Sequence, residues 1–199
     1  MIDLYEYIIG DVQWIKEDYI VLENGGIGYK IFTSYNSSLK LDMGMKDVMM
    51  YTYYNLREDG VYLYGFTDEL EIDIFKLLIT VSKIGPKVAI GILSAMTPNQ
   101  IKMGIAKKDI ESLCKAPGVG KKTAERMILE LKDKIEVDDY IEEEIDTKTD
   151  DGEYEEAVNG LVSLGYTRFE VEKILRDVDV SELGIEEIIR YTLKNLSKN

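Results

Sequence analysis

Two copies of one short pattern, Ile84-Gly85-Pro86-Lys87-Val88-Ala89 and Val119-Gly120-Lys121-Lys122-Thr123-Ala124, determine how the middle of this chain is predicted to fold. The copies superpose at four places: Gly85 on Gly120, Lys87 on Lys122, Ala89 on Ala124, and Ile92-Leu93 on Met127-Ile128. A tight glycine turn lets backbone N–H groups approach an anion, and the following helix adds the positive end of its dipole. Each copy predicts a helix–hairpin–helix unit that holds a phosphate. The alternative is an ordinary helix–helix turn whose lysines are only solvated.

The charge of the chain is distributed unevenly. The formal net charge is −14, which taken alone argues against binding to nucleic acid. The segment 82–126 nevertheless carries nine basic and three acidic residues, a local net charge of +6. The segment 136–156 carries twelve acidic residues and one lysine, a local net charge of −11. A basic island centred on the glycine turns indicates a nucleic-acid surface, and the like-charged run predicts a solvated linker over residues 136–151.

The composition excludes several kinds of chemistry. The chain has no histidine and a single cysteine, Cys114, so it lacks the commonest general base and metal ligand and forms no internal disulfide. We expect no catalytic residue, no metal and no cofactor. The segment Gly120-Lys121-Lys122-Thr123 fails as a P-loop, because Lys115 and Lys122 stand where glycine and Ser/Thr are required. Neither a signal peptide nor a run of about 20 apolar residues is found, so we expect a cytoplasmic protein without a membrane partner.

Residues 1–66 are predicted to form β-structure. Short runs rich in Ile, Val and Tyr are separated by Gly-Gly, Asn and Asp-Gly turn signals, which is typical of a small barrel or sandwich. The predicted strands are Leu4–Ile9, Val12–Lys16, Tyr19–Leu22, Gly28–Thr33, Asp47–Leu56 and Val61–Phe66. The near-alternation of the tyrosines favours packing on strand faces over stacking on bases; these are Tyr51, Tyr53, Tyr54, Tyr62 and Tyr64.

Residues 67–135 change to a helical period. Thr97-Pro98-Asn99-Gln100 predicts a helix start, with a threonine cap, a first-turn proline and a glutamine three residues after the cap. Asp109 is predicted to cap a short helix that runs through Cys114, and a last helix is predicted from Lys121 to Lys134. From residue 152 the period returns in three short helices. Such a small bundle is typical of a module that binds another protein.

Glu58 and Asp59 precede Gly60 at an Asp-Gly hairpin signal, and we expect both carboxylates at an exposed tip. Three interpretations apply to the pair. It is a soluble hairpin tip, a pair of catalytic carboxylates, or a negative charge that repels phosphates and keeps strands apart at a branch point. The lack of histidine and of a clear metal cluster argues against catalysis, and the other two interpretations stay open.

These motifs together resemble the RuvA family over the whole length of the chain. The resemblance rests on Leu56-Arg57-Glu58-Asp59-Gly60, Leu63-Tyr64-Gly65-Phe66, Gly25-Gly26-Ile27-Gly28-Tyr29, both glycine turns, and the terminal pattern Ala157, Leu161, Leu164-Gly165-Tyr166. It implies a multidomain α+β protein. Residues 1–66 would form an N-terminal OB-fold barrel, 67–135 an all-α domain with two helix–hairpin–helix motifs, 136–151 an acidic linker, and 152–199 a C-terminal three-helix, UBA-like bundle.

The resemblance also implies a function. The chain would be a non-catalytic subunit of the Holliday junction branch migration complex, which acts in DNA recombination, DNA repair and the SOS response. It would form a homotetramer, or an octamer on DNA, that binds a four-way junction by shape and phosphate contacts. The RuvB hexameric ATPase and the RuvC resolvase would be its partners.

The resemblance assigns roles by position. Glu58 and Asp59 would be acidic pins at the junction centre. The expected DNA-binding residues are Lys83, Gly85, Lys87, Gly118, Gly120, Lys121, Lys122 and Arg126. The expected RuvB contacts are Leu161, Leu164 and Tyr166.

Some positions depart from the family pattern, and two other function classes remain. Asp3 and Tyr7 stand where the family often has glycine, and Lys83 stands where the second copy has Gly118, so we expect a less open first turn that gains a charge. One alternative is a helix–hairpin–helix repair enzyme, such as a glycosylase or nuclease, which would need a catalytic lysine–aspartate pair or a metal cluster. The other is an adaptor whose hairpins only pack helices.

Overall fold

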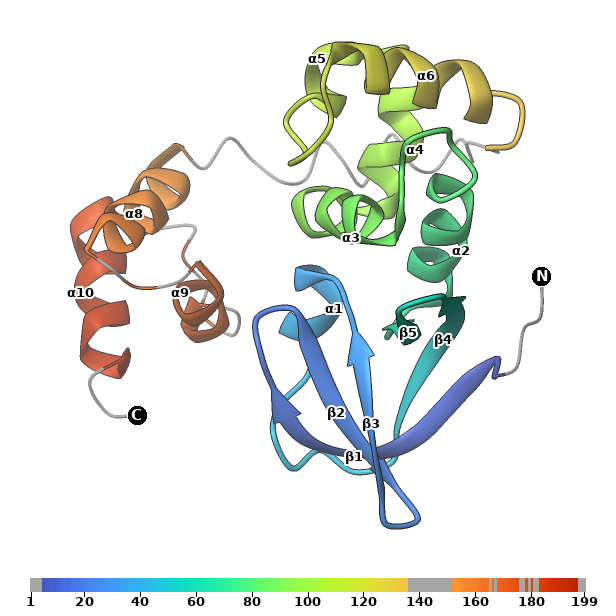
Figure 1. The fold of residues 1–199 in the computed structure, drawn as a ribbon. Coiled ribbons are helices and arrows are strands. Elements are labelled where there is room, and N and C mark those ends of the chain that lie inside the picture. The colour runs from blue at the N-terminus through green and yellow to red at the C-terminus, as the bar shows by residue number, and fades with distance from the viewer. Residues whose placement is uncertain are drawn as a thin grey trace. The chain divides into compact units, whose positions relative to one another are not determined.

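The computed structural model describes residues 5–135, 152–164, 166, 168–175, 178, 180 and 183–196 (Figure 1). The chain divides into two compact units, Met1–Ile141 and Glu142–Asn199. The first unit holds a β-barrel and a helical region, and the second is a helical bundle. The predicted linker over 136–151 lies outside the described residues.

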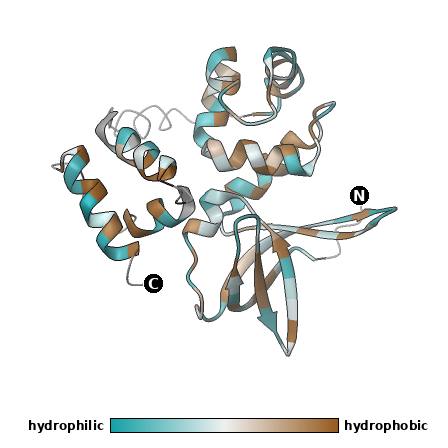
Figure 2. Ribbon diagram, turned by 60° about the vertical axis from the view of Figure 1, so that its left-hand side comes forward, coloured by the Kyte–Doolittle hydropathy of each residue, from teal (hydrophilic) through white to brown (hydrophobic). Residues whose placement is uncertain are grey.

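The N-terminal part of the first unit is a closed five-stranded barrel with strand order β1-β2-β3-β5-β4. Neighbouring strands are antiparallel except β3 and β5, which are parallel. Hydrophobic and hydrophilic residues alternate along the strands (Figure 2), so one face of each strand fills the barrel. The strands are β1 Tyr7–Ile15, β2 Tyr19–Asn24, β3 Ile27–Phe32, β4 Val48–Arg57 and β5 Gly60–Phe66.

Two features of the barrel differ from the sequence prediction. The predicted strands Leu4–Ile9 and Val12–Lys16 overlap one strand, β1, which runs from Tyr7 to Ile15 and continues through a bulge between Val12 and Trp14. Leu4 lies outside the described residues. Gly10 marks a close approach, not a break: a Cβ there would lie 2.4 Å from the backbone oxygen of Glu23 on β2. The short helix α1, Tyr35–Leu39, was not predicted, because five residues carry too little periodicity to be recognised.

The helical region contains five helices, and its helix starts follow the predicted caps. Thr97 and Gln100 form the predicted capping box, and Asp109 caps the short helix as predicted. The last helix ends at Leu131, three residues earlier than predicted. The helices are α2 Glu69–Leu78, α3 Pro86–Ala95, α4 Pro98–Ala106, α5 Ile110–Leu113 and α6 Lys121–Leu131.

The barrel and the helical region share one hydrophobic core. Phe75 of α2 packs against three aromatic rings of β4 and β5, with centroid distances of 5.5 Å to Tyr53, 5.5 Å to Tyr64 and 5.1 Å to Phe66. All four side chains are buried, so the predicted packing of Tyr53 and Tyr64 on a strand face is confirmed. Because β4 and β5 carry the Glu58-Asp59 tip at their far end, this core ties that hairpin to the helices.

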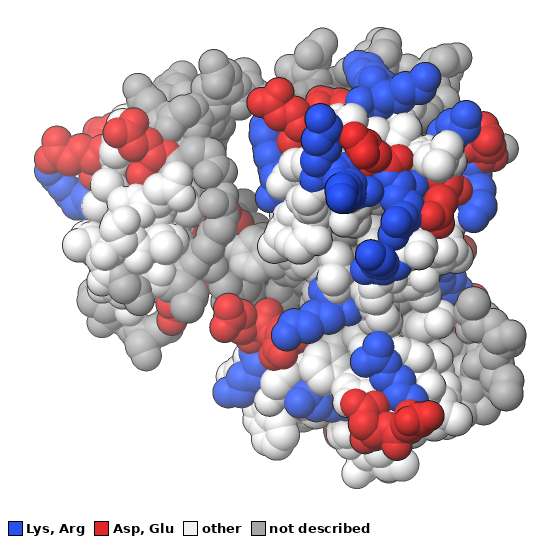
Figure 3. Space-filling model, turned by 45° about the horizontal axis from the view of Figure 1, so that its top comes forward, with Lys and Arg blue, Asp and Glu red and all other residues white. Residues whose placement is uncertain are grey.

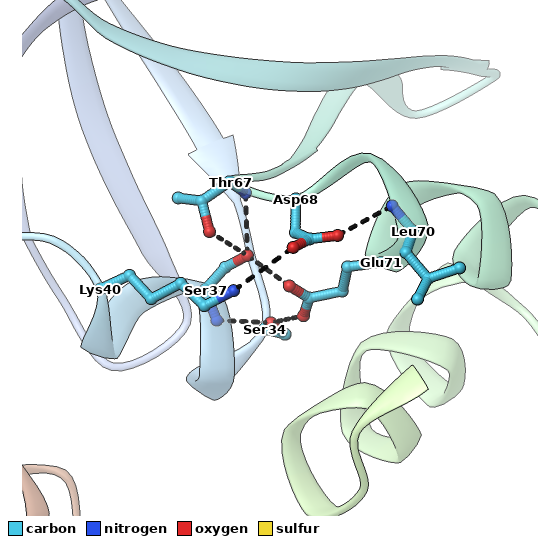
Figure 4. Close-up of polar contacts among 7 residues, drawn as sticks. All are labelled: Ser34, Ser37, Lys40, Thr67, Asp68, Leu70 and Glu71. Carbon is cyan, nitrogen blue, oxygen red and sulfur yellow. Dashed lines mark hydrogen bonds and ion pairs between the residues drawn. The ribbon is translucent and has the colours of Figure 1, made fainter. Parts of the chain in front are cut away.

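A buried carboxylate forms a second contact between barrel and helices (Figure 4). Glu71 of α2 is only 2% exposed and accepts hydrogen bonds from the hydroxyls of Ser34 and Ser37 next to and within α1, the latter at 2.7 Å. Ser37 Oγ also accepts from the Thr67 backbone N–H at 3.0 Å. Burial raises the pKa of Glu71 against the opposing effect of these hydrogen bonds.

The second unit is a three-helix bundle, as the sequence predicted. Its helices are α8 Gly152–Ser163, α9 Arg168–Leu175 and α10 Ile185–Leu196. Its core consists of Ala157, Val158, Leu161, Val171, Leu175 and Ile188. Gly165 of the terminal Leu164-Gly165-Tyr166 pattern lies outside the described residues.

The raised pKa of Glu71 predicts a measurable pH dependence of stability. Between the unfolded pKa of a glutamate, about 4.3, and the higher folded pKa, the folded chain binds more protons than the unfolded chain. The free energy of unfolding therefore falls as pH rises through this window. Glu71→Gln should remove this fall in urea titrations at fixed protein concentration, and Glu69→Gln, at an exposed position in the same helix, should keep it. Parallel profiles for wild type and Glu71→Gln would contradict the assignment.

Candidate nucleic-acid interface

The two glycine turns of the helical region have the same backbone conformation. Lys83 in the first turn has φ 74° and Gly118 in the second has φ 80°. Two residues later, Gly85 precedes α3 with φ −93° and ψ 173°, and Gly120 precedes α6 with φ −94° and ψ 172°. Both turns therefore direct the N-terminus of the following helix in the same way.

Hydrogen bonding and burial repeat in the same register. The Ile84 N–H donates to Val81 O at 3.0 Å, and the Val119 N–H donates to Ala116 O at 3.1 Å. The carbonyl oxygen of each N-cap glycine accepts a hydrogen bond from the first turn of its helix. Gly85 O accepts from the Ala89 N–H, and Gly120 O accepts from the Ala124 N–H. The apolar residues of the repeat are buried in both copies: Val81 and Ala116, Ile84 and Val119, Ala89 and Ala124, and Ile92-Leu93 and Met127-Ile128. The duplicated sequence is thus a duplicated structure.

Lys83 does not make the first turn less open, contrary to the expectation from sequence. Its backbone takes the left-handed conformation that Gly118 takes in the second turn, at a cost of about 1–2 kcal/mol for a residue with a side chain. The side chain is exposed. The first turn therefore keeps its geometry and gains a charge.

Each turn leaves a helix N-terminus open. Gly85 and Gly120 receive no side-chain cap, and a Cβ at either position would meet nothing within 4 Å. Free N–H groups and the helix dipole favour an anion there. The turns differ in one donor, because α3 begins with Pro86, which has no N–H, whereas α6 begins with Lys121.

Lysines surround these open helix ends. The side chains of Lys87, Lys121 and Lys122 are exposed. On the face shown in Figure 3, lysine and arginine side chains gather over the helical region with a few acidic ones among them. Each turn therefore forms a backbone cradle, meaning free N–H groups at a helix N-terminus next to exposed lysines. Such a cradle suits a phosphate group and does not distinguish one base from another.

Arg126 belongs to α6, the helix that follows the second turn, but its side chain contacts the first turn. Its guanidinium Nη1 donates to Ser82 O at 3.0 Å, and its Nε lies 3.8 Å from the Glu130 carboxylate. Glu130 Oε2 accepts from the Ser82 backbone N–H at 3.3 Å. No sequence pattern indicated a role for Glu130, because a contact between residues 48 positions apart leaves no periodic signal.

Glu58 and Asp59 occupy the turn between β4 and β5, beyond the last pair Arg57–Gly60, and both are exposed as predicted. Asp59 accepts a hydrogen bond from the Tyr62 hydroxyl at 3.1 Å, and this bond raises the pKa of Tyr62. The Arg57 guanidinium lies 5.8 Å from the Tyr62 ring centroid. The tip is therefore acidic but held by a neighbouring aromatic residue.

The three C-terminal residues singled out from sequence differ in position. Leu161 is fully buried in the bundle core, Tyr166 is partly buried against it, and Leu164 is 66% exposed. Leu161 therefore supports the surface of the bundle, and Leu164 belongs to it. Val162 and Tyr191 are further exposed apolar side chains of the bundle.

The part of the chain that the structure describes has neither a metal-type cluster nor a membrane-spanning helix. No group of three or more His, Cys, Asp or Glu side chains in that part of the chain is arranged to hold a metal ion. None of the helices described is long and apolar enough to span a bilayer.

Comparison with protein families matches three parts of the chain. Residues 4–65 match the RuvA N terminal domain, residues 75–133 match the SAM-like helix-hairpin-helix tandem, and residues 152–197 match the RuvA C-terminal domain. These ranges contain the barrel except its last residue, Phe66, then the two hairpins, and then the bundle.

Curated relatives match along the whole chain. A protein of Alkaliphilus oremlandii is 48% identical over 199 residues, covering 98% of this chain and 100% of the relative. A protein of Clostridium beijerinckii is 41% identical over 197 residues, covering 97% and 99%. Both relatives carry the name Holliday junction branch migration complex subunit RuvA.

The left-handed conformation of Lys83 predicts the effect of a glycine there. Lys83→Gly should stabilise the protein by about 0.5–1 kcal/mol, because the relief of strain exceeds the added entropy of the unfolded chain. Chemical denaturation would measure this change. Lys108, with φ 56°, should respond in the same direction, whereas Lys87→Gly in α3 should destabilise. A loss of stability in Lys83→Gly would show that the strain is not there.

Proposed function

The chain belongs to the RuvA family, and on this premise we propose that it is the non-catalytic, junction-binding subunit of a Holliday junction branch migration complex. It would act in DNA recombination, in DNA repair and in the SOS response to DNA damage. The observation that carries the proposal is the pair of matching hairpins, each of which ends at an open helix N-terminus beside exposed lysines. The described residues hold no metal-type cluster that would favour a repair nuclease.

The hairpins are proposed to bind the sugar–phosphate backbone of the junction arms. The N–H groups after Gly120 and, with one donor fewer, after Gly85 would donate hydrogen bonds to phosphate oxygens, and Lys87, Lys121 and Lys122 would add charge. Contacts to the backbone carry no sequence information. Binding would therefore depend on branch geometry, which allows DNA of any sequence to slide during migration.

Glu58 and Asp59 are proposed to act at the crossing point. Their carboxylates lie at an exposed hairpin tip, so they would repel phosphates and keep the strands of the four arms apart. The shared core of Tyr53, Tyr64 and Phe75 supports this role, because it fixes the hairpin relative to the helices that would bind the arms.

Fourfold symmetry would present the same hairpins to all four arms, and we propose a homotetramer, with an octamer when a second tetramer covers the DNA. Residues 1–66 would supply the assembly contacts. Exposed apolar side chains on the paired strands β1 and β4 support this, namely Tyr7, Ile9 and Met49, because patches of this kind are typical of interfaces.

The C-terminal unit is proposed to bind the RuvB hexameric ATPase, which would supply ATP hydrolysis. Residues 67–135 would bind DNA, 136–151 would be the tether, and 152–199 would be the module that engages RuvB. The exposed Leu164 and partly buried Tyr166 support a contact surface there, with Leu161 beneath it. The RuvC resolvase as a further partner, and a cytoplasmic location, enter the proposal from the family alone.

The salt dependence of junction binding tests the phosphate contacts. Each contact contributes about 0.9 to the slope of log affinity against log salt, so Lys122→Glu should weaken binding and flatten the slope. Fluorescence anisotropy with a synthetic four-way junction measures both. Lys134→Glu makes the same change of charge beyond the C-terminal end of α6 and should change the slope less. An unchanged affinity and slope in Lys122→Glu would count against the hairpin assignment.

The repulsion assigned to the hairpin tip makes a separate prediction. The double variant Glu58→Gln, Asp59→Asn removes both charges, so it should bind junctions as well as wild type or more tightly. It should also reduce strand separation at the crossing, seen as lower fluorescence of 2-aminopurine placed there. A collapse of junction binding in this variant would refute the repulsive role.

A further inference from the structure

The two hairpins contact each other through equivalent positions, but by different chemistry. When Gly85 is superposed on Gly120, Gly91 corresponds to Arg126 and Ser82 corresponds to Pro117. A Cβ at Gly91 would lie 3.3 Å from the ring of Pro117, so the backbone of α3 packs directly on the second turn. In the reverse direction, α6 reaches the first turn through the Arg126 side chain, which donates to Ser82 O.

The second turn needs no such support. Pro117 has a fixed φ and lacks an N–H, and the next residue is Gly118, which takes the left-handed conformation without a steric penalty. The residues of this turn are therefore suited to its geometry before any tertiary contact is made.

The first turn has neither advantage. Ser82 is free to rotate about φ and carries an N–H that needs a partner, and Lys83 bears the strain of the left-handed conformation. Both polar groups of the Ser82 backbone are bonded to α6: its carbonyl to Arg126 at 3.0 Å and its N–H to Glu130 at 3.3 Å. The Arg126 Nε lies 3.8 Å from the Glu130 carboxylate, which joins the two contacts into one clamp.

We infer that Arg126 and Glu130 are positioning residues that hold the first hairpin in its phosphate-binding conformation. This inference rests on the proposed function and assigns Arg126 a different part in it. Arg126 acts on DNA through Ser82 and Lys83, not as a phosphate ligand. Glu130 strengthens DNA binding although its charge has the sign that repels phosphate.

Glu130 gives the sharpest test, because geometry and charge predict opposite results. Glu130→Ala removes the acceptor of the Ser82 N–H and should weaken junction binding by about tenfold, the factor expected for one hydrogen bond to a charged group. Glu130→Gln loses the same charge but keeps an oxygen acceptor, and its affinity should stay close to that of wild type. Glu125→Ala, at an exposed position of the same helix, is the control for charge alone and should bind as tightly as wild type or more tightly.

The inference is wrong if Glu130→Ala and Glu130→Gln both bind as Glu125→Ala does, because charge alone would then account for the effect. It is also wrong if both variants weaken binding equally, because the acceptor would then not matter.

Amide hydrogen exchange of the DNA-free protein tests the clamp without any ligand. The reporter is the Ile84 N–H, which bonds to Val81 O within the first turn, and the reference is the Val119 N–H, which bonds to Ala116 O within the second. Arg126→Gln and Glu130→Ala should accelerate exchange at Ile84 and leave Val119 unchanged. If Arg126 served only to bind phosphate, its loss would not alter the hairpin in the absence of DNA. Unchanged exchange at Ile84 in both variants therefore overturns the inference.

This readout separates the inference from the proposed function. If wild type fails to bind junctions, the proposed function fails, while faster exchange at Ile84 still supports the clamp. If wild type binds junctions with a steep salt dependence and the exchange at Ile84 does not change, the function stands and the clamp is refuted.

Discussion

The structure depends most on a left-handed residue placed two positions before a helix N-terminus. In the second hairpin this residue is Gly118, and in the first it is Lys83. This conformation reverses the chain, so that the N-cap glycine two residues later leaves the N-terminus of the following helix facing solvent. No side chain caps the N–H groups at that end of the helix. Without that reversal the adjacent lysines would be scattered surface charges. With it, they lie beside backbone donors and a helix dipole.

The hairpins matter for function only if their position relative to the acidic tip is fixed. Two of the contacts between barrel and helices contribute most directly to this. The rings of Tyr53, Tyr64 and Phe66 pack on Phe75, and the buried Glu71 carboxylate accepts from Ser34 and Ser37. The first contact is large and apolar and supplies stability. The second is directional, because a carboxylate in low dielectric requires its donors in specific places.

The sequence predicted those parts of the fold whose signals are local. The duplicated turns, the capping box at Thr97 and the cap at Asp109 were predicted correctly, since each depends on residues within one or two helical turns. The continuity of β1 between Ile9 and Val12 was not predicted, because a glycine needed for a close approach to β2, here Gly10, has the same sequence signal as a glycine in a turn.

Tertiary contacts account for what was missed in the candidate site. Arg126 was assigned as a DNA contact by its position in the family pattern, and the structure shows that its guanidinium donates to Ser82 O of the other hairpin. No role was predicted for Glu130, because its contact with Ser82 also joins residues that are far apart in the sequence. Leu161 was assigned as a partner contact by the resemblance, and the structure places it in the bundle core, a distinction that the apolar period of a helix does not show.

The central claim is that two matching backbone cradles bind DNA by phosphate position and branch shape. It is tested most directly by measuring, across a salt titration, the affinity of the full chain for four-way junctions of several unrelated sequences and for linear duplexes of the same composition. The account predicts the same tight binding and steep salt slope for every junction, and much weaker binding to the duplexes. Equal affinity for junctions and duplexes, or no junction binding at low ionic strength, would contradict it.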